Sequence, residues 1–326
     1  MKAFACDEEL LISGANLEQS YFTDRQDRYM YFGAAGDLAH YHHSLIHALG
    51  SMGARVTAKK STSNAVTVTP AGPVSADEWS RRLKECTQLS QPRPVVYTTT
   101  TSEADTWVLP SLQCAPLGVH QDEEMTAELL KAVPDNSTLN LSTAYLNPTP
   151  PLIRALAEAA PTGRTNLLSA HPDSHGFKGA RGLMAYVPLC YEHLLTQRVV
   201  PALRAARPGP SSCVNVLAYQ RASWTFHAKG IWVFPKASEN NVVSESEGAV
   251  TVVGSSNFGR RSSELDLECQ MTILTESPEL SAALKDEWSW LEERCAKPQD
   301  PVLEEGATTG SFGATSVMSS LMGKFL

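Results

Sequence analysis

The sequence predicts an α/β protein in which helices flank mixed β-sheets. The main observation behind this fold class is that strand-like and helix-like segments alternate along the whole chain. Its 326 residues suffice for one large or two medium domains, and an apolar content of 42% with a charged content of 19% is typical of a soluble globular protein. The formal net charge of -8 argues against a protein that coats nucleic acid, because such a protein needs a basic surface.

The chain opens with a predicted hairpin. Ala3–Cys6 and Leu10–Ile12 have strand character, and a turn at Asp7–Glu9 joins them. A loop rich in Ser, Thr, Gly and Pro is expected over residues 51–76. The other elements predicted up to residue 133 are helices at Ala34–Leu49, Ala76–Leu89 and Asp122–Val133 and strands at Val95–Thr100 and Trp107–Leu117.

The second half continues the alternation and ends in a tail of its own character. Its predicted strands are Thr138–Tyr145, Thr165–Ala170, Val214–Tyr219, Lys229–Phe234, Ala249–Val253 and Leu267–Leu274. Its predicted helices are Thr149–Ala160, a helix that follows the basic loop "HPDSHGFKGARG" and ends at about Ala205, and Pro278–Cys295. The polar stretch Pro235–Gly248 is predicted to extend a hairpin into solvent. Apolar residues at helical spacing near the end predict either a tail that packs on the protein or frays, or a short membrane-docking helix.

The residues best suited to chemistry lie in "TFHAKGIWVF" and "VTVVGSSNFGRRSSELDLE". His227 and Lys229 are two apart, so an extended chain points both side chains to one face. The turn Gly254-Ser255-Ser256-Asn257 offers backbone N–H groups and a side-chain amide to a ligand, and Glu268 follows 11 positions after Asn257. A neutral imidazole can attack phosphorus, Lys and Asn can stabilise phosphate oxygens, and a carboxylate can orient the imidazole. The combination indicates phosphodiester chemistry.

The opening segment repeats this pattern in part. Lys2 and Asp7 have the K-x4-D spacing, and Ser13-Gly14-Ala15-Asn16 takes the place of the later turn. Asp27 follows 11 positions after Asn16, the separation found between Asn257 and Glu268. The second copy departs from the pattern at Phe234, which stands where an Asp is expected. In the first copy the histidine would precede Met1, so the first half is expected to be incomplete and the chain N-terminally truncated.

Together these segments resemble the two HKD motifs of the phospholipase D superfamily, whose members consist of two pseudo-symmetric halves. A narrower resemblance is carried by "SGANLEQSYFTDRQDRY", "NLSTAYLNPT", "GFKGARG", "RASWTFHAKGIWV" and "GSSNFGRRS". These stretches are similar to the eukaryotic mitochondrial phosphatidylglycerophosphate synthases, and the similarity spans nearly the whole chain. It is weakest over residues 51–110 and 235–248.

The resemblance implies a phosphatidyl transfer from CDP-diacylglycerol to glycerol 3-phosphate, with phosphatidylglycerophosphate, a cardiolipin precursor, and CMP as products. The first-motif histidine would be the nucleophile that carries the phosphatidyl group, and His227 would be the general acid and base. Lys2, Lys229, Asn16 and Asn257 would bind phosphate, while Asp27 and Glu268 would each orient the histidine of their own half. Asp7 is a catalytic position in the superfamily, although a structural role is expected here.

Further candidates for binding the substrate come from neighbouring segments. The basic loop Gly176–Gly182 offers Lys178 and Arg181, and the first motif is followed by Arg25 and Arg28. Each of these candidates has a plainer alternative, a flexible turn for the loop and a surface ion pair for the two arginines. Tyr145 is expected either in the cleft or in the core.

Neither a metal nor a cofactor is expected. His40, His42, His43 and His47 are close in sequence, but no neighbouring Cys or acid completes a ligand set, so an ordinary helix face is preferred. The seven scattered cysteines predict reduced thiols, because none forms a C-x-x-C pair.

The expected organisation is a partial first half at 1–136, a second half at 137–300 and a tail at 301–326. By resemblance, the protein is expected to be a transferase at the mitochondrial inner membrane, attached peripherally and without a nucleic-acid partner. Two alternatives stay open: a phospholipase or phosphodiesterase of the same superfamily, and a catalytically incomplete fragment that lacks one histidine.

Overall fold

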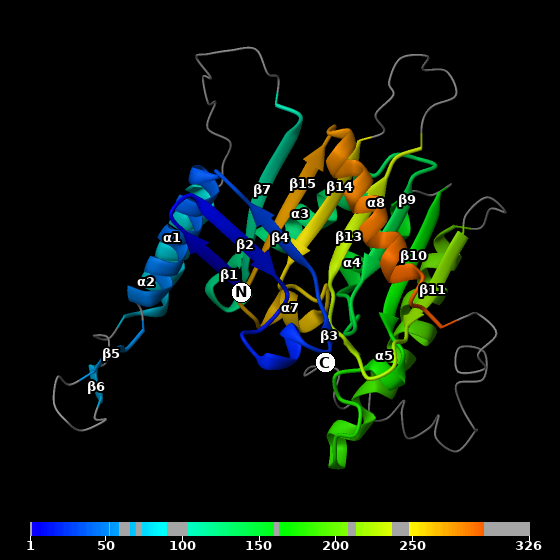
Figure 1. The fold of residues 1–326 in the computed structure, drawn as a ribbon, viewed down its shortest axis with the longest axis horizontal. Coiled ribbons are helices and arrows are strands. Elements are labelled where there is room, and N and C mark those ends of the chain that lie inside the picture. Colours follow the sequence, from blue (N-terminus) through cyan, green and yellow to red (C-terminus); the bar gives the residue numbers. More distant parts are fainter. Residues whose placement is uncertain are drawn as a thin grey trace.

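A central mixed sheet of eight strands organises the protein (Figure 1). The structure is a computed structural model that describes residues 2–51, 53–58, 66–69, 74–89, 104–159, 163–207, 213–236 and 248–296. The strand order is β11-β10-β9-β13-β14-β15-β7-β8. In that order the strands are Cys213–Tyr219, Arg164–Ala170, Thr138–Ser142, Gly230–Phe234, Ala249–Gly254, Glu268–Thr275, Thr106–Cys114 and Val119–His120. The predicted α/β class is confirmed.

A smaller sheet lies in front of the central one (Figure 1). It has three antiparallel strands in the order β1 (Ala3–Cys6), β2 (Glu9–Ser13) and β4 (Tyr29–Phe32), so the predicted opening hairpin is confirmed. Leu10 and Ile12 alternate toward one face and pack against Val253 of the central sheet and its neighbours Met271 and Ile273. This contact joins the start of the chain to the end of the second half.

Helices cover both faces of the central sheet. On one face α3 (Gln121–Lys131), α4 (Pro150–Glu158) and α6 (Val200–Ala206) pack over β9, β10, β13 and β14. On the other face α8 (Pro278–Glu292) lies beside the small sheet and packs Leu284, Trp288 and Leu291 against Trp232 and its neighbours. Consecutive residues Val252 and Val253 belong to opposite layers, which explains why this strand is apolar without alternation.

Two helices close the edge of the sheet near β7. α1 (Gly36–Ser51) and α2 (Ala76–Leu89) were both predicted and pack Tyr41, Leu45 and Leu83 against Leu112. The loop predicted over residues 51–76 is wrong in part, because β5 (Arg55–Ala58) and β6 (Val66–Thr69) form a hairpin there. Their Val and Thr residues have high β-propensity, which the small turn-forming residues around them obscured.

The helix expected up to about Ala205 is divided into several short pieces. They are η4 (Gly182–Tyr186), α5 (Val187–Leu194), the π-helical turn η5 (Leu195–Val199) and α6. Pro201 lies in the first turn of α6 and has no N–H to give to the preceding turn, so the α-helical pattern is interrupted there.

A two-residue parallel ladder is the element that positions the site. β3 (Arg25–Gln26) pairs with β12 (Thr225–Phe226), Arg25 opposite Thr225 and Gln26 opposite Phe226. The backbone N–H of His227 continues the ladder by donating to the carbonyl oxygen of Gln26 at 2.8 Å. Asp27 and His227 are the next residues in register, so segments 200 positions apart meet at one point.

Several sequence predictions lie outside the described residues. These are the strand at Val95–Thr100, most of the extension Pro235–Gly248, Met1 and the tail at 301–326. The division at residue 136 stays a prediction, and the central sheet contains strands from both sides of it. Within the described part of the chain, no helix combines the length and apolar character that crossing a membrane requires. The remaining short elements are η1 (Gln19–Phe22), η2 (Ala115–Leu117), η3 (Pro172–Ser174) and α7 (Arg260–Glu264).

Candidate active site

Both repeated segments contribute to one cavity of about 490 Å³ at the edge of the central sheet where β9 and β14 end. Six of the predicted site residues line it, two from the first copy of the motif and four from the second: Lys2, Asn16, His227, Ser255, Asn257 and Glu268. The strand order β1-β2-β4 in the first segment matches β13-β14-β15 in the second. The two lysines, Lys2 and Lys229, each directly precede the first strand of their set.

His227 is held by the carboxylate of Asp27. Its Nδ1 lies 2.6 Å from Asp27 Oδ2, and the Asp27 side chain is fully buried. The expectation that Asp27 orients the histidine of its own half is therefore wrong, because Asp27 belongs to the first segment and His227 to the second. The placement of Asp27 among phosphate ligands is also wrong, since its other oxygen accepts from the backbone N–H of Arg28.

The proton of the imidazole can be assigned from these contacts. Nδ1 lies 2.6 Å from the Asp27 carboxylate and 2.8 Å from Lys229 Nζ, and one ring nitrogen cannot donate to the first and accept from the second. The carboxylate contact is shorter and involves an acceptor-only group, so we place the proton on Nδ1, where it is donated to Asp27. Lys229 instead donates to the carbonyl oxygen of His227, and Nε2 keeps its lone pair for the cavity.

Burial sets the charge of this pair. Desolvation, helped by the positive charge of Lys229, lowers the pKa of His227 to about 4, although Asp27 acts in the opposite direction. Desolvation also lowers the pKa of Lys229 to about 8, with Asp27 opposing and Lys2 adding to the shift. At neutral pH the imidazole is therefore uncharged, while the ammonium of Lys229 remains largely protonated.

Glu268 is the counterpart of Asp27 on the other side of the cavity. The hydroxyl of Ser255 and that of Ser262 both donate to its carboxylate, the latter at 2.9 Å. Glu268 lines the same cavity as Lys2 but bonds to no histidine among the described residues. The role expected of Glu268, to orient a histidine, stays a prediction.

The first turn is tightly packed beneath the cavity. A Cβ at Gly14 would lie 2.7 Å from Asp27 Oδ1 and 2.9 Å from Lys229 Nζ, so only glycine leaves room for these two groups. The hydroxyl of Ser13 fastens the turn by donating to the Arg28 carbonyl oxygen at 2.6 Å and accepting from the Ala15 N–H at 2.9 Å. The close packing of this turn therefore holds the side chains of Asp27 and Lys229 in place.

Other predicted residues lie away from the cavity surface. Gly254 and Ser256 shape the second turn from within, and Lys229 is buried beneath His227. Asp7 is exposed at the tip of the first hairpin with a φ of 51°, which fits the structural role expected of it. Neither Lys178 nor Arg181 lines the cavity, and Lys178 forms an ion pair with Asp173 at 3.2 Å.

Arg28 is wrong as a phosphate ligand. Its guanidinium is buried and forms two hydrogen bonds to Glu287, at 2.8 and 2.7 Å, and two more to Thr251 and the Val252 carbonyl. It also lies 3.8 Å from the ring centre of Trp232. Arg25, by contrast, lines the cavity, as the substrate-binding alternative requires.

An aromatic wall completes the cavity and was largely missed. Tyr145 was a candidate, but Tyr21, Phe177 and Tyr191 were not, because nothing in their spacing distinguishes them from core residues. The rings of Tyr21 and Tyr145 meet His227 edge-on, with centres 5.2 and 5.8 Å away. These contacts remove water from the imidazole and account for much of its lowered pKa.

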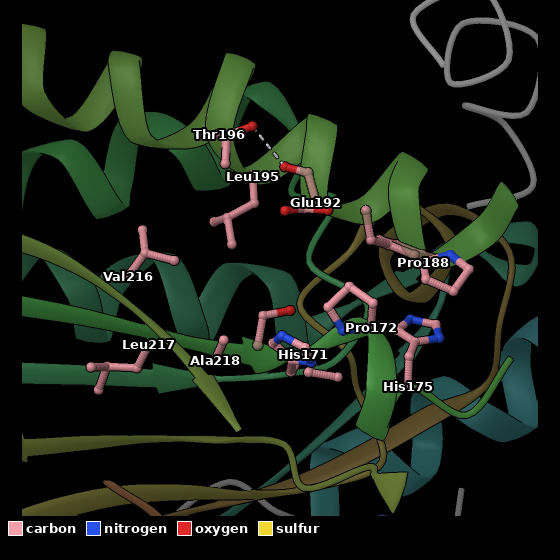
Figure 2. A pocket seen from close by; sticks show the side chains of 13 residues that line it. His171, Pro172, His175, Pro188, Glu192, Leu195, Thr196, Val216, Leu217 and Ala218 are labelled. Carbon is pink, nitrogen blue, oxygen red and sulfur yellow. Dashed lines mark hydrogen bonds between the residues drawn. The ribbon is translucent and has the colours of Figure 1, made fainter. Parts of the chain in front are cut away.

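A second, much smaller pocket lies between β10, β11 and the α5–η5 segment. Figure 2 shows His171 and His175 on one side of it and Glu192 on the other. Its volume of about 20 Å³ is close to the space that one water molecule needs. Burial lowers the pKa of His175 to about 4 and raises that of Glu192, which favours the uncharged form of each side chain. This pocket is too small for a phosphate ester.

The histidine-rich helix forms no metal site in the described residues, where no group of three His, Cys, Asp or Glu side chains is arranged to hold an ion. His42 is buried, with Nδ1 2.9 Å from the Leu38 carbonyl oxygen, while His40, His43 and His47 are exposed.

The central mixed sheet and the two motifs that meet at one cavity are the arrangement expected from the resemblance to the phospholipase D superfamily. A solved structure with this arrangement is the phosphatidylserine synthase of Haemophilus influenzae, which aligns with 98% of this chain and 70% of its own at a TM-score of 0.60 and 17% identity. At that identity the likeness establishes the fold alone. No family model matches the chain.

Curated relatives make the resemblance more specific. The human mitochondrial CDP-diacylglycerol–glycerol-3-phosphate 3-phosphatidyltransferase is 28% identical over 314 residues, covering 88% of this chain and 54% of the human one. A Dictyostelium discoideum protein named as a probable enzyme of the same kind is 27% identical over 308 residues, and one from Saccharomyces pastorianus is 28% identical over 309. The resemblance predicted from the motifs is thus confirmed, and the chain spans about half the length of the curated relatives it matches.

Proposed function

We propose that the chain carries the site for transfer of a phosphatidyl group from CDP-diacylglycerol to glycerol 3-phosphate, giving phosphatidylglycerophosphate and CMP. The names of its curated relatives support these two substrates. The observation that carries the proposal is the uncharged imidazole of His227, backed by Asp27 and open to a cavity with Lys2 and the amides Asn16 and Asn257.

The proposed reaction has two displacements at the same phosphorus. In the first, a histidine nitrogen bonds to the phosphorus that carries the diacylglycerol while the bond from that phosphorus to CMP breaks. In the second, the hydroxyl oxygen of glycerol 3-phosphate bonds to the phosphorus while the bond to histidine breaks, and its proton passes to the other histidine. The resemblance gives the role of proton acceptor to His227, whose Nε2 is unprotonated at neutral pH and therefore available to accept a proton.

The surrounding residues fit an anionic substrate with more than one phosphate. Lys2 and Arg25 enter the cavity from the first segment and Arg261 from the second. The buried ammonium of Lys229 lies behind the imidazole. Positive groups fixed in a partly dehydrated site stabilise charge on non-bridging oxygens without having to reorganise. The lining thus holds three cations against two acids, Asp266 and Glu268, although the whole chain has a net charge of -8.

Membrane attachment and location extend the proposal. A diacyl donor resides in a bilayer, so a peripheral protein at a membrane surface is the arrangement that the chemistry favours. The mitochondrial names of several relatives support a mitochondrial location. We propose attachment at the inner membrane.

The test is release of CMP from CDP-diacylglycerol with and without glycerol 3-phosphate. Because the chain spans about half the length of its curated relatives, the assay should compare the chain with a version extended upstream. His227→Ala should abolish release in that version, whereas His47→Ala, on the exposed face of α1, should not.

Two results would contradict the proposal. Equal CMP release in the absence of glycerol 3-phosphate would indicate a hydrolase, and undiminished release by His227→Ala would place the chemistry elsewhere.

A further inference from the structure

Large apolar side chains stand exposed in the segments that surround the cavity. Leu17 and Phe22 are 81% and 70% exposed in the segment after β2. Leu183, at 61%, and Tyr186 are exposed in η4, and Leu265 is exposed directly after α7. We call these five residues the apolar rim. Soluble proteins rarely expose several large apolar side chains close together, so this group of residues needs an explanation.

The rim residues share one end of the molecule. Each lies within two positions of a residue that lines the cavity, namely Asn16, Tyr21, Met184, Val187 and Asp266. Because consecutive Cα atoms are only about 3.8 Å apart, all five rim residues lie close to this cavity. In Figure 1 the labels α5 and α7 and the blue segment before β3 all lie at the lower end of the sheet. The rim is thus contributed by three separate segments.

The η4 part of the rim is accompanied by a cation. Lys178 is paired with Asp173 at 3.2 Å, so the positive charge next to Leu183 is that of Arg181. Gly179 and Gly182 flank Arg181 with φ of 75° and 62°, and a Cβ at either would meet no atom within 4 Å. Glycine is therefore required there by the backbone shape, which presents Arg181 and Leu183 to solvent, and not by lack of space.

We propose that the apolar rim docks on the surface of an anionic phospholipid bilayer. Leu17, Phe22 and Leu183 would enter the boundary of the acyl chains, and Arg181 would meet lipid phosphates. The identity of the bound surface rests on the proposed function, in which a lipid donor must reach His227.

The dimensions of the cavity support this occupant. About 490 Å³ is the volume of a pocket for one drug-sized polar molecule, so it suits a nucleotide and phosphates but not two long acyl chains in addition. The chains of the donor would stay in the bilayer while its head group enters the cavity. A rim of apolar residues near that entrance would hold the cavity against the bilayer surface, so that the donor head group can reach His227.

The test uses vesicle co-sedimentation of the full chain with a four-to-one mixture of phosphatidylcholine and phosphatidylglycerol. Two variants remove parts of the rim from different segments, Leu17→Ser with Phe22→Ser and Leu183→Ser with Tyr186→Ser. The matched control is Val56→Ser with Val68→Ser on the β5–β6 hairpin, where the valines are 62% and 56% exposed but line no part of the cavity. Circular dichroism checks that every variant is folded.

Each rim variant should bind the vesicles roughly tenfold more weakly, because removing two partly inserted side chains forfeits apolar burial. The control should bind like the unchanged chain. Arg181→Gln should weaken binding to the mixed vesicles but not to phosphatidylcholine alone. Rim variants that bind like the unchanged chain, or a control that is weakened equally, would overturn the proposal.

A separate measurement distinguishes this inference from the proposed function. With a short-chain CDP-diacylglycerol dispersed in water, the upstream-extended chain should turn over equally well with and without the rim substitutions. Rim-dependent vesicle binding without any turnover would refute the transferase and leave the docking surface standing. If the rim substitutions leave turnover at vesicles unchanged, the docking surface is refuted and the transferase stands.

Discussion

At the scale of single residues, the chemistry depends on where the proton of His227 lies. Asp27 fixes it on Nδ1, and the low pKa leaves Nε2 free to accept a proton or bond to phosphorus. The motif spacing predicted His227, Lys2, Asn16 and Asn257 at the cavity, because turns and strand ends determine where such residues lie. It could not predict which carboxylate serves which histidine, since that depends on contacts 200 residues apart.

Asp27→Asn should reduce turnover by roughly 10²–10⁴-fold, because the amide can neither stabilise an imidazolium nor hold the required tautomer. Since Asp27 raises the pKa of His227, the variant should also move the acid side of the pH profile to lower pH. Steady-state CMP release measures both. The control Asp24→Asn removes an exposed carboxylate three residues away and should behave like the unchanged chain. Equal losses in the two variants would argue against a special role for Asp27.

The pH dependence of kcat/KM should be bell-shaped. Activity should fall below about pH 4, where His227 takes up a proton, and above about pH 8, where Lys229 loses its charge. Lys229→Arg keeps a cation at high pH, so any residual activity in that variant should lack the alkaline fall. An alkaline fall that persists in Lys229→Arg would assign it to another group.

At the scale of elements, two turns of small residues bring the motifs together. Alternating patterns predicted most strands and helices within a few residues, including the hairpin at the start. The β5–β6 hairpin and the broken helix before α6 were missed, because exposed short strands and proline-interrupted helices leave weak periodicity. Residue patterns describe a segment well when its burial alternates, and poorly when it does not.

Gly14→Ala should disturb the site more than its size suggests. The added Cβ would come within 3.0 Å of Asp27 Oδ1 and Lys229 Nζ, so one of them must move. We expect at least a tenfold loss of kcat with little change in secondary structure, measured by CMP release and circular dichroism. The control Gly50→Ala adds a methyl group to α1, where nothing lies within 4 Å, and should keep full activity. A fully active Gly14→Ala would show that Asp27 or Lys229 can shift without loss of activity.

At the scale of the whole molecule, Arg28 joins the N-terminal segment to the rest. It connects the strand β4 region to α8 through Glu287 and to β14 through Thr251 and Val252. The α/β class was predictable from the alternation of elements. The contact between Arg28 and α8 was not predictable, because an arginine next to such a motif resembles a phosphate ligand in sequence.

Arg28→Ala should lower the free energy of unfolding by roughly 3–5 kcal/mol, because it leaves the partly buried Glu287 without its cation. Urea denaturation followed by circular dichroism measures the change. Arg81→Ala is the matched control, since Arg81 forms its ion pairs on an exposed face of α2 and its loss should hardly matter. If both variants unfold at the same urea concentration, Arg28 is not the tie that its contacts indicate.

The short ladder between β3 and β12 has a consequence for the order of folding. It brings residues 25–27 beside 225–227, so the pair of Asp27 and His227 can form only after a loop of about 200 residues has closed. During synthesis, Asp27 leaves the ribosome long before its partner exists, and the small sheet must wait for β14 and β15 to cover its apolar face. The contact between Asp27 and His227 is therefore among the last that the chain can form, and a chain that stops before residue 227 cannot form it at all.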